Sequence, residues 1–282
     1  MKNETGYFKG RELKELFYQN WLPDNGEIKA YIIAIHGWGT HSDRMALPAE
    51  YLTEKGYAIY SFDLRGHYRN AGEILGHIDS IDHIQKDILL FMDFIQERID
   101  DKKIFLMGHS FGGLLCLIFA INHPDLPGIL ISSPLLEMYM KLSMGKKVIK
   151  SISSTIAKLS PNKILNNIID QNQLTSDLKI LRKHIANKNK IEFISAKSAT
   201  EIEKFAKWAM DNASNLICPI MIMQGGNDKI VDKKKAEEFF AKVKSKDKTY
   251  KEYPGFLHEV WNEKGRVQVY QDMFVWLEKH IK

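Results

Sequence analysis

The sequence predicts an α/β fold in which helices flank a mostly parallel central sheet. Over residues 30–135, short apolar runs typical of buried strands alternate with longer amphipathic runs typical of helices. The same alternation resumes near residue 216 and continues to the C-terminus. Between these two parts, residues 136–215 show helical patterns rich in Lys, Asn and Ile. We therefore expect a core built from residues 1–135 and 216–282, interrupted by an inserted helical cap over residues 136–215.

The length and composition indicate one globular domain with a sizeable core. The chain has 282 residues, of which 44% are hydrophobic and 27% are charged. No apolar run is long enough to span a bilayer, and residues 1–21 lack the apolar centre of a signal peptide, so we expect a cytoplasmic protein. Residues 136–215 hold 14 Lys and Arg against 7 Asp and Glu. This scattered excess does not predict a nucleic-acid partner, but it would suit transient contact with an anionic membrane surface.

The individual elements follow from hydrophobic periodicity. An antiparallel pair is expected to open the chain within residues 7–21. A strand at residues 30–35 precedes a helix at residues 42–54, for which Ser42 is the expected N-cap. The later elements expected in the core are a strand at 57–62, a helix at 81–99, a strand at 103–107, a buried helix at 114–120, strands at 128–134 and 219–224, a helix at 232–243, a short strand at 249–253 and a helix at 266–281.

The most informative stretch is GHSFGG at residues 108–113, which places G-x-S-x-G between a buried strand and a buried helix. In that context the serine occupies a strained turn, at a cost of about 1–3 kcal/mol, that lifts its hydroxyl above the sheet edge. A side chain at Gly108 or Gly112 would collide with the adjoining helix or strand. We therefore expect a nucleophile elbow in which Ser110 is the nucleophile and His109 packs on the sheet. A purely structural glycine-rich turn is the alternative.

A second glycine-containing loop, HGWG at residues 36–39, directly follows the strand at residues 30–35. Its glycines let the backbone approach a substrate oxygen closely. We expect the backbone N–H groups of Trp38 and Phe111 to form an oxyanion hole, with the N-terminus of the helix after the elbow adding positive potential. For HGWG alone, a structural turn is an equal alternative.

Two further loops follow strands whose carboxyl ends should meet at the same sheet edge. Asp228 follows the strand at residues 219–224, and His258 follows the strand at residues 249–253. Ser110 needs a base to accept its proton, and His258 would be that base. Asp228 would hold the histidine tautomer and stabilise the imidazolium.

Other candidate residues fit structural roles better. Asp232 stands where a helix begins and is expected to cap it, and His280 is expected to be exposed in the last helix. Ser132 and Ser133 lack flanking glycines. The two cysteines, at positions 116 and 218, lie in apolar segments and are expected to be buried thiols. No cluster of His, Cys and carboxylates has ligand spacing, so neither a metal nor a cofactor is expected.

Five stretches together resemble the monoacylglycerol lipase and lysophospholipase branch of the α/β-hydrolases, which is grouped with the S33-type serine aminopeptidases. They run in the family order, and they are HGWGTHS at 36–42, FDLRGH at 62–67, GHSFGG at 108–113, QGGND at 224–228 and YPGFLHE at 253–259. The resemblance covers the chain from about residue 30 to the end. Within this range, the cap matches the family only in its position along the chain. It implies an α/β-hydrolase fold, a catalytic triad of Ser110, Asp228 and His258, and oxyanion donors at Trp38 and Phe111.

The leading hypothesis is a serine hydrolase that cleaves carboxylic esters of single-chain lipids, such as monoacylglycerols or lysophospholipids. The alternatives are a general short-chain carboxylesterase, an aminopeptidase or amidase with an acidic cluster for a free amino terminus, and a ligand-binding protein on a hydrolase scaffold. Thr40 and Tyr68 stand where family members often carry Glu and Gly, which changes the loops that line the pocket. The amphipathic run at residues 139–159 is either an ordinary packing helix or a lid that rests on lipid.

Overall fold

The computed structural model describes residues 1–24, 26–99, 101–139, 159–166, 169–187, 190–191 and 193–281. The strands are β1 (Lys2–Lys9), β2 (Glu15–Leu22), β3 (Ala30–Ile35), β4 (Tyr57–Phe62), β5 (Ile104–His109), β6 (Ile129–Ser132), β7 (Ile164–Asn166), β8 (Phe193–Ser195), β9 (Ile220–Gly225) and β10 (Lys248–Tyr253). The α-helices are α1 (Ala46–Glu54), α2 (Ile81–Gln96), α3 (Phe111–Asn122), α5 (Leu178–Ile185), α6 (Ala196–Asn212), α7 (Lys233–Lys242) and α8 (Arg266–His280). Short 3₁₀ helices include η2 (Ser42–Met45), η4 (Gln171–Gln173) and η6 (Val260–Asn262).

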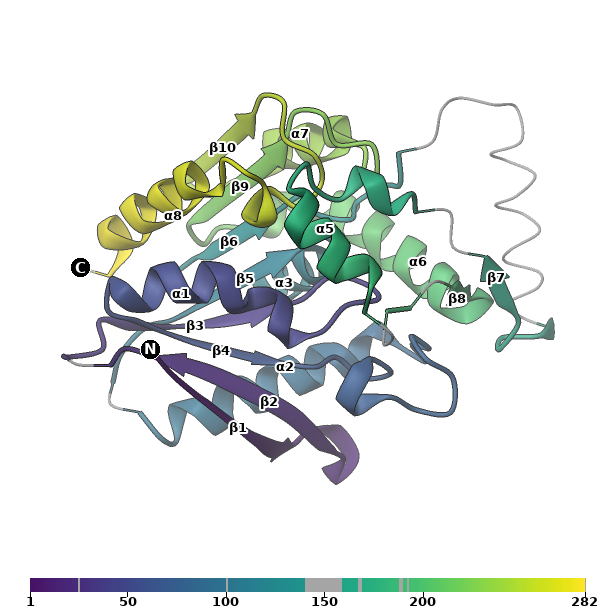
Figure 1. Cartoon of the computed structure of the whole chain (residues 1–282), viewed down its shortest axis with the longest axis horizontal. Helices are drawn as coiled ribbons and strands as arrows, with labels where there is room; N and C mark the ends of the chain where they lie inside the picture. The colour runs from purple at the N-terminus through teal and green to yellow at the C-terminus, as the bar shows by residue number, and fades with distance from the viewer. Residues whose placement is uncertain are drawn as a thin grey trace.

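A single eight-stranded sheet organises the core, in the order β1-β2-β4-β3-β5-β6-β9-β10 (Figure 1). The pairs β1–β2 and β2–β4 are antiparallel, and every other neighbouring pair is parallel. Ile35 of β3, Gly108 of β5 and Ile131 of β6 stand side by side in the register. The loops that follow these strands therefore open on one edge of the sheet. The mostly parallel sheet expected from the sequence is confirmed, as is the opening antiparallel pair.

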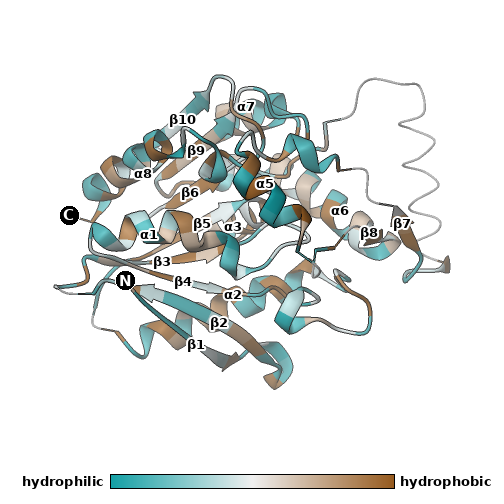
Figure 2. Cartoon of the chain, in the orientation of Figure 1, coloured by the Kyte–Doolittle hydropathy of each residue, from teal (hydrophilic) through white to brown (hydrophobic). Residues whose placement is uncertain are grey.

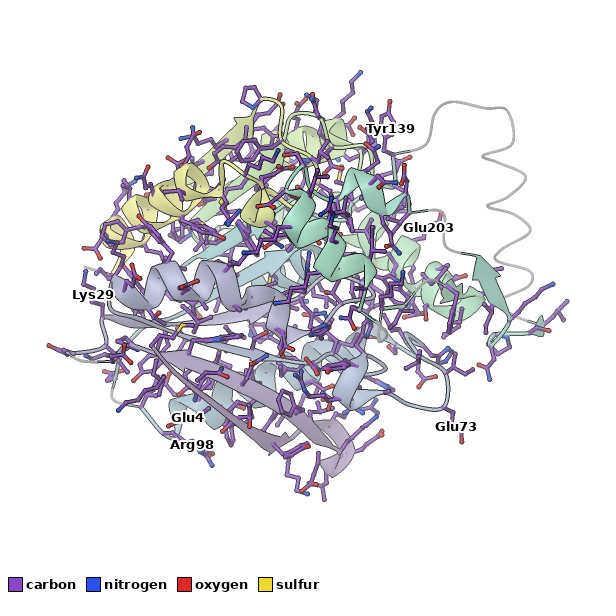
Figure 3. All side chains as sticks on the ribbon, in the orientation of Figure 1. Glu4, Lys29, Glu73, Arg98, Tyr139 and Glu203 are labelled. Carbon is purple, nitrogen blue, oxygen red and sulfur yellow. The ribbon has the colours of Figure 1, made fainter. Side chains whose placement is uncertain are left out.

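Helices cover both faces of this sheet because its central strands are apolar on both sides. Ile33 and Ile35 point into the core that contains α2 and α3, whereas Ile32 and Ala34 point into the core that contains α1 and α8. Figure 2 shows hydrophilic and hydrophobic residues on the flanking helices, as expected of amphipathic elements. Charged side chains such as Glu73 lie at the periphery (Figure 3). Among the helices of the described ranges, none combines the length and the apolar character needed to cross a bilayer.

The prediction for the helix at residues 42–54 is wrong at its start. Residues 42–45 form η2, and α1 begins only at Ala46. Ser42 does not cap this element, because its hydroxyl donates to Asp63 Oδ1 at 2.7 Å and its N–H donates to the same oxygen at 2.8 Å. Ser42 thus ties the loop after β3 to the loop after β4.

The segment at residues 136–215 contains helices, as expected, but it is not purely helical. β7 and β8 form an antiparallel pair, and each has three residues, too few to display a strand period in the sequence. α6 packs against the core helix α3, and its residues Ile202, Phe205 and Ala209 belong to the same buried cluster as the side chains of α3. Figure 1 shows α5, β7 and β8 on the side of the molecule toward which the parallel strands point. Of the amphipathic run at residues 139–159, only its two end residues belong to the described part of the chain.

Candidate active site

Ser110 occupies the sharp turn between β5 and α3, at the centre of the sheet edge. Its φ of 54° and ψ of −115° lie outside the regions that a serine ordinarily adopts. A Cβ on Gly108 would lie 2.7 Å from Cys116 Sγ on α3, and a Cβ on Gly112 would lie 2.6 Å from the carbonyl oxygen of His36. Both glycines are therefore required by the close approach of strand, turn and helix, as the sequence predicts.

Asp228 and His258 meet beside this turn. His258 Nδ1 lies 2.8 Å from Asp228 Oδ2, which also accepts a hydrogen bond from the Gln224 side chain at 3.0 Å. The other carboxylate oxygen accepts from the backbone N–H groups of Ile230 and Val231 at 2.8 and 3.0 Å. Burial raises the pKa of Asp228, but the His258 ring and the N–H donors lower it more, so the net pKa lies below its ordinary value. The carboxylate is thus anionic and faces Nδ1 of the histidine.

The His258 ring packs against the residue that precedes Ser110. Its centroid lies 4.7 Å from that of His109, whose Nδ1 lies 3.0 Å from Ser132 Oγ. Burial, and next the nearby His258, lower the pKa of His109 to about 3, so its ring is neutral. The Ser133 hydroxyl donates to the His258 carbonyl at 2.8 Å. The sequence pattern does not predict Ser133 as a nucleophile, and only the structure shows that its hydroxyl helps to hold His258.

The loop after β3 passes directly beside Ser110. A Cβ on Gly37 would lie 3.5 Å from Ser110 Cβ, and the Trp38 and Phe111 rings contact each other edge to face at 5.9 Å. Among the described residues, the backbone N–H groups of Trp38 and Phe111 have no hydrogen-bond acceptor. The Thr40 hydroxyl donates to the Gly37 carbonyl at 2.9 Å and closes this loop on itself.

The loop that carries His258 is bound along its length by residues 173–177, which immediately precede α5. Two consecutive backbone N–H groups, of His258 and Glu259, donate to carbonyl oxygens of this segment at 3.4 and 2.8 Å. The remaining contacts are Thr175 Oγ1 to the Asn262 carbonyl at 2.8 Å, Ser176 N–H to Glu263 Oε1 at 3.0 Å, Ser176 Oγ to Glu263 Oε2, and Arg266 to Asp177 at 2.9 Å. Nothing in the sequence pattern indicates this contact, which joins segments about 87 positions apart.

The residues that were alternatives to the proposed triad take structural roles, and one of them, His280, differs from the sequence prediction. Asp232 caps α7 by accepting from the Lys234 N–H at 3.0 Å, as expected. His280 is not exposed: its side chain is 7% accessible and its ring stacks on Trp276 at 4.0 Å. The position of His280 in the last turn of an amphipathic helix hides this packing from the sequence. Both cysteines are buried free thiols. Within the described ranges, no group of three or more His, Cys, Asp or Glu side chains is arranged to hold a metal ion.

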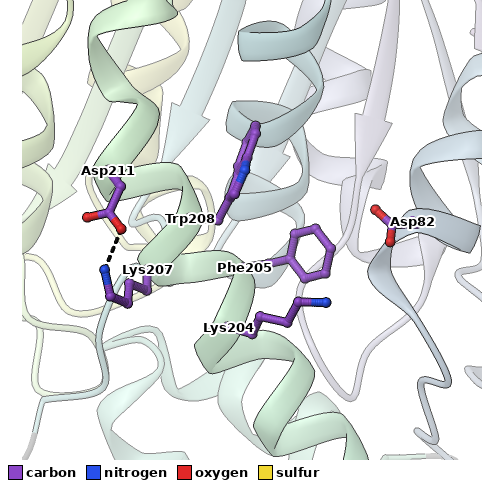
Figure 4. A pocket seen from close by; sticks show the side chains of 6 residues that line it. All are labelled: Asp82, Lys204, Phe205, Lys207, Trp208 and Asp211. Carbon is purple, nitrogen blue, oxygen red and sulfur yellow. Dashed lines mark hydrogen bonds and ion pairs between the residues drawn. The ribbon is translucent and has the colours of Figure 1, made fainter.

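Two surface hollows lie elsewhere. One, of about 440 Å³, lies over α6 and the start of α2 (Figure 4) and is lined by Asp82, Lys204, Phe205, Lys207, Trp208 and Asp211. The other, of about 570 Å³, is bordered by the ends of α2 and α3 and the start of β5. Neither includes Ser110, Asp228 or His258 among its lining residues.

An eight-stranded, mostly parallel sheet with a serine on a strained strand-to-helix turn, and with an Asp–His pair beside it, defines a member of the α/β-hydrolases. The family model described as "Serine aminopeptidase, S33" matches residues 26–265, so the chain belongs to this family. The motifs from which the resemblance was inferred therefore identified the family correctly.

The individual relatives reported below share less than 30% sequence identity with this chain. The chain is 27% identical over 255 residues to phospholipase YtpA of Bacillus subtilis, covering 89% of this chain and 96% of that protein. It is 28% identical over 287 residues to the monoglyceride lipase of Saccharomyces cerevisiae, covering 93% and 90%. A crystal structure of a soluble variant of the yeast enzyme with a substrate analog matches with a TM-score of 0.89, at 26% identity and 99% and 95% coverage. An abhydrolase domain-containing protein of Dictyostelium discoideum is 29% identical over 95% of this chain, which spans 28% of that protein's length.

Proposed function

We propose that this protein is a serine hydrolase that cleaves carboxylic esters of single-chain lipids, monoacylglycerols or lysophospholipids, through an acyl-enzyme on Ser110. The observation that supports this most strongly is the 2.8 Å contact between His258 Nδ1 and Asp228 at the sheet edge where Ser110 is held in a strained turn. A base oriented by a buried carboxylate beside a raised hydroxyl is the arrangement that acyl transfer requires.

In the proposed reaction, Ser110 Oγ attacks the ester carbonyl carbon while His258 Nε2 takes the hydroxyl proton. Asp228 holds the imidazolium that forms. The carbonyl oxygen gains negative charge and accepts hydrogen bonds from the N–H groups of Trp38 and Phe111, each worth roughly 10²–10³ in rate. His258 then gives its proton to the departing alcohol, and a water activated by the same histidine releases the acid. The residues of this chain supply every proton transfer in the cycle.

The lipid assignment draws on the relatives. A monoglyceride lipase and a phospholipase each align with this chain over most of their lengths. The proposed cap, residues 136–215, adds exposed apolar side chains on the side toward which the parallel strands point, with Leu159, Ile164 and Leu178 being 80%, 52% and 57% exposed. Lys179 and Lys183 of α5, the helix that begins at Leu178, are also exposed. We therefore include transient contact with an anionic membrane surface through this basic cap in the proposal.

Flotation with phosphatidylglycerol vesicles tests the membrane contact. The protein should float with anionic vesicles at low salt and lose this binding when Lys179 and Lys183 are both replaced by Glu. Absence from the floated fraction would reject the contact and leave the hydrolase assignment standing. The cytoplasmic location stays a prediction from the sequence, which cell fractionation tests.

Aminopeptidase activity is the second candidate, because the family model is named for it. That activity needs free carboxylates near the base to bind a substrate amino group. Glu259 and Glu263 are the two buried carboxylates that follow His258 most closely in the sequence. Glu259 is paired with Arg44, and Glu263 accepts a hydrogen bond from the Ser176 N–H. This engagement favours the esterase.

Turnover of p-nitrophenyl esters from acetate to palmitate, with and without a fluorophosphonate that labels active serines, tests the proposal. We expect a medium- or long-chain optimum, stoichiometric labelling, and loss of both in Ser110→Ala with an unchanged circular dichroism spectrum. Turnover of acetate and butyrate only would replace the lipid substrate by short-chain esters. Folded protein without label or turnover would refute the hydrolase and favour a ligand-binding protein. Aminoacyl p-nitroanilides, if cleaved faster than any ester, would favour the aminopeptidase.

A further inference from the structure

A buried ion pair outside the candidate triad joins the loop that carries the base to the loop that carries an oxyanion donor. The Arg44 guanidinium donates to Glu259 Oε2, and the two side chains are only 14% and 4% exposed. Glu259 directly follows His258, whereas Arg44 lies in η2, six residues after Trp38. The two partners are 215 positions apart in the sequence.

Stability alone is a weak reason for such a pair. Removing two charges from water costs about as much as their attraction returns, and a hydrophobic pair of similar volume is often as stable. Here the carboxylate receives a further hydrogen bond, from Asn262 Nδ2 at 3.0 Å. Burial raises the pKa of Glu259, but Arg44, and after it His109 and His184, lower it more, to about 2. The pair is therefore ionised at any pH at which the enzyme would work.

Both ends of the pair belong to segments that are otherwise held rigidly. On one side, Thr40 closes the loop on the Gly37 carbonyl, and the Ser42 N–H and hydroxyl donate to Asp63. Arg44 follows this anchored stretch by two residues, so its backbone is held at a fixed place relative to the loop that carries Trp38. Arg44 is in this way coupled to the donor that the oxyanion would use.

On the other side, hydrogen bonds hold the backbone at His258 and at the residue that follows it. The Glu259 N–H donates to the Leu174 carbonyl at 2.8 Å, and the His258 carbonyl accepts from Ser133 Oγ at 2.8 Å. The Glu259 side chain in turn joins this loop to η2 through its ion pair with Arg44. Asp228 fixes the rotation of the imidazole, but it does not fix the distance from the base to the oxyanion loop.

We infer that Arg44 and Glu259 are positioning residues, which set the spacing between the base His258 and the oxyanion donor Trp38. Neither touches the substrate. Because proton transfer and oxyanion stabilisation act on the same carbonyl, a change in this spacing slows the chemical step more than it weakens substrate binding. The inference rests on the proposed function, and the experiment below separates the two.

The experiment compares Glu259→Gln with Glu278→Gln, which is the same change at the opposite end of the strands. Glu278 accepts from Lys29 and from Tyr57, the first residue of β4, and Figure 3 labels Lys29 on the side of the molecule away from β7. For each protein we would measure kcat and KM on the best p-nitrophenyl ester, the rate and final extent of fluorophosphonate labelling, and the thermal unfolding midpoint. All assays are run at least 10 °C below the lowest midpoint.

Glu259→Gln is expected to lower kcat about 10- to 100-fold with KM changed less than about threefold, since misplacement by about 1 Å costs on that order. Labelling should slow by a similar factor yet still reach one serine per chain. Glu278→Gln should keep kcat within about twofold. If Glu259→Gln lowers the unfolding midpoint but leaves kcat per labelled serine unchanged, the role is structural and the inference is overturned.

Two variants on the other side of the pair keep the inference testable if Glu259→Gln does not fold. Arg44→Gln should lower kcat per labelled serine, and Arg44→Lys, which keeps the charge, should recover part of the loss. Equal kcat in Arg44→Gln and the wild type would overturn the inference. A wild type that neither labels nor turns over ester would instead refute the proposed function, and with it the reaction that these residues are said to serve.

Discussion

Replacing Gly225 by Ala is expected to slow the reaction about a hundredfold while leaving the fold intact. Gly225 is the last residue of β9, and the loop that carries His258 passes directly across it. A Cβ at this position would lie 2.8 Å from the Phe256 carbonyl oxygen and 2.9 Å from the Leu257 carbonyl carbon, with the Leu257 oxygen nearer still. Ordinary contacts of a Cβ begin at about 3.4 Å.

The size of the effect follows from these distances. Relief of the two longer contacts alone requires a shift of about 0.5–0.6 Å, and relief of the Leu257 oxygen requires more, so the loop should move by at least about 1 Å. A misplacement of about 1 Å at a catalytic group costs on the order of 10² in rate, which is about 3 kcal/mol of transition-state stabilisation. Overpacking of this kind should also cost about 1–3 kcal/mol of folding free energy.

The assay is kcat per labelled serine on the best p-nitrophenyl ester, with the unfolding midpoint measured in parallel. Gly72→Ala is the matched control, because nothing lies within 4 Å of a Cβ there. We expect a lower midpoint and a lower kcat for Gly225→Ala, and no change for Gly72→Ala. A Gly225→Ala protein with wild-type kcat per labelled serine would refute the reasoning, since the base would then tolerate the displacement that the contact requires.

Two further predictions concern the buried carboxylates. Asp228→Asn should lower kcat about 10⁴-fold at pH 7 with little change in KM, because an amide facing Nδ1 stabilises the wrong tautomer; steady-state kinetics would contradict this if the loss were below tenfold. For Glu259, the folded-state pKa of about 2 lies below its ordinary 4.5, so its contribution to stability is complete above about pH 4.5 and is lost as the pH falls toward 2. Urea unfolding at pH 6 and pH 3 should therefore show a loss of unfolding free energy in the wild type that exceeds the loss in Glu259→Gln by on the order of 2 kcal/mol, and identical losses in the two proteins would reject this assignment.

The elements that could be predicted from the sequence are those whose chemistry is local. The glycines around Ser110 are dictated by the turn itself, and the strand and helix on either side show as uninterrupted apolar runs. Asp228 and His258 could be chosen because each follows a strand, and parallel strands carry their loops to one edge. The residue types at strand ends therefore carried most of the information about the site.

The features that sequence reasoning missed depend on contacts between distant segments. Ser42 satisfies the usual pattern of an N-cap, yet its hydroxyl finds Asp63, 21 positions away. Ser133 has no glycine neighbours and so does not look functional, yet its hydroxyl holds the His258 carbonyl, 125 positions away. β7 and β8 are too short for their period to be distinguished from a helical pattern.

The contact between residues 173–177 and the base loop changes how the proposed cap should be regarded. An inserted segment that only covered the substrate could be exchanged freely between relatives to alter specificity. Here, however, the backbone acceptors of His258 and Glu259 come from Gln173 and Leu174, and the buried Glu263 is shared between Ser176 and the Leu257 N–H at 2.9 Å. Residues 173–177 of the proposed cap therefore hold the loop that carries His258 in place. We therefore expect that a change of substrate made through the proposed cap preserves the hydrogen bonds of residues 173–177 to the His258 loop, while the rest of the cap is free to vary.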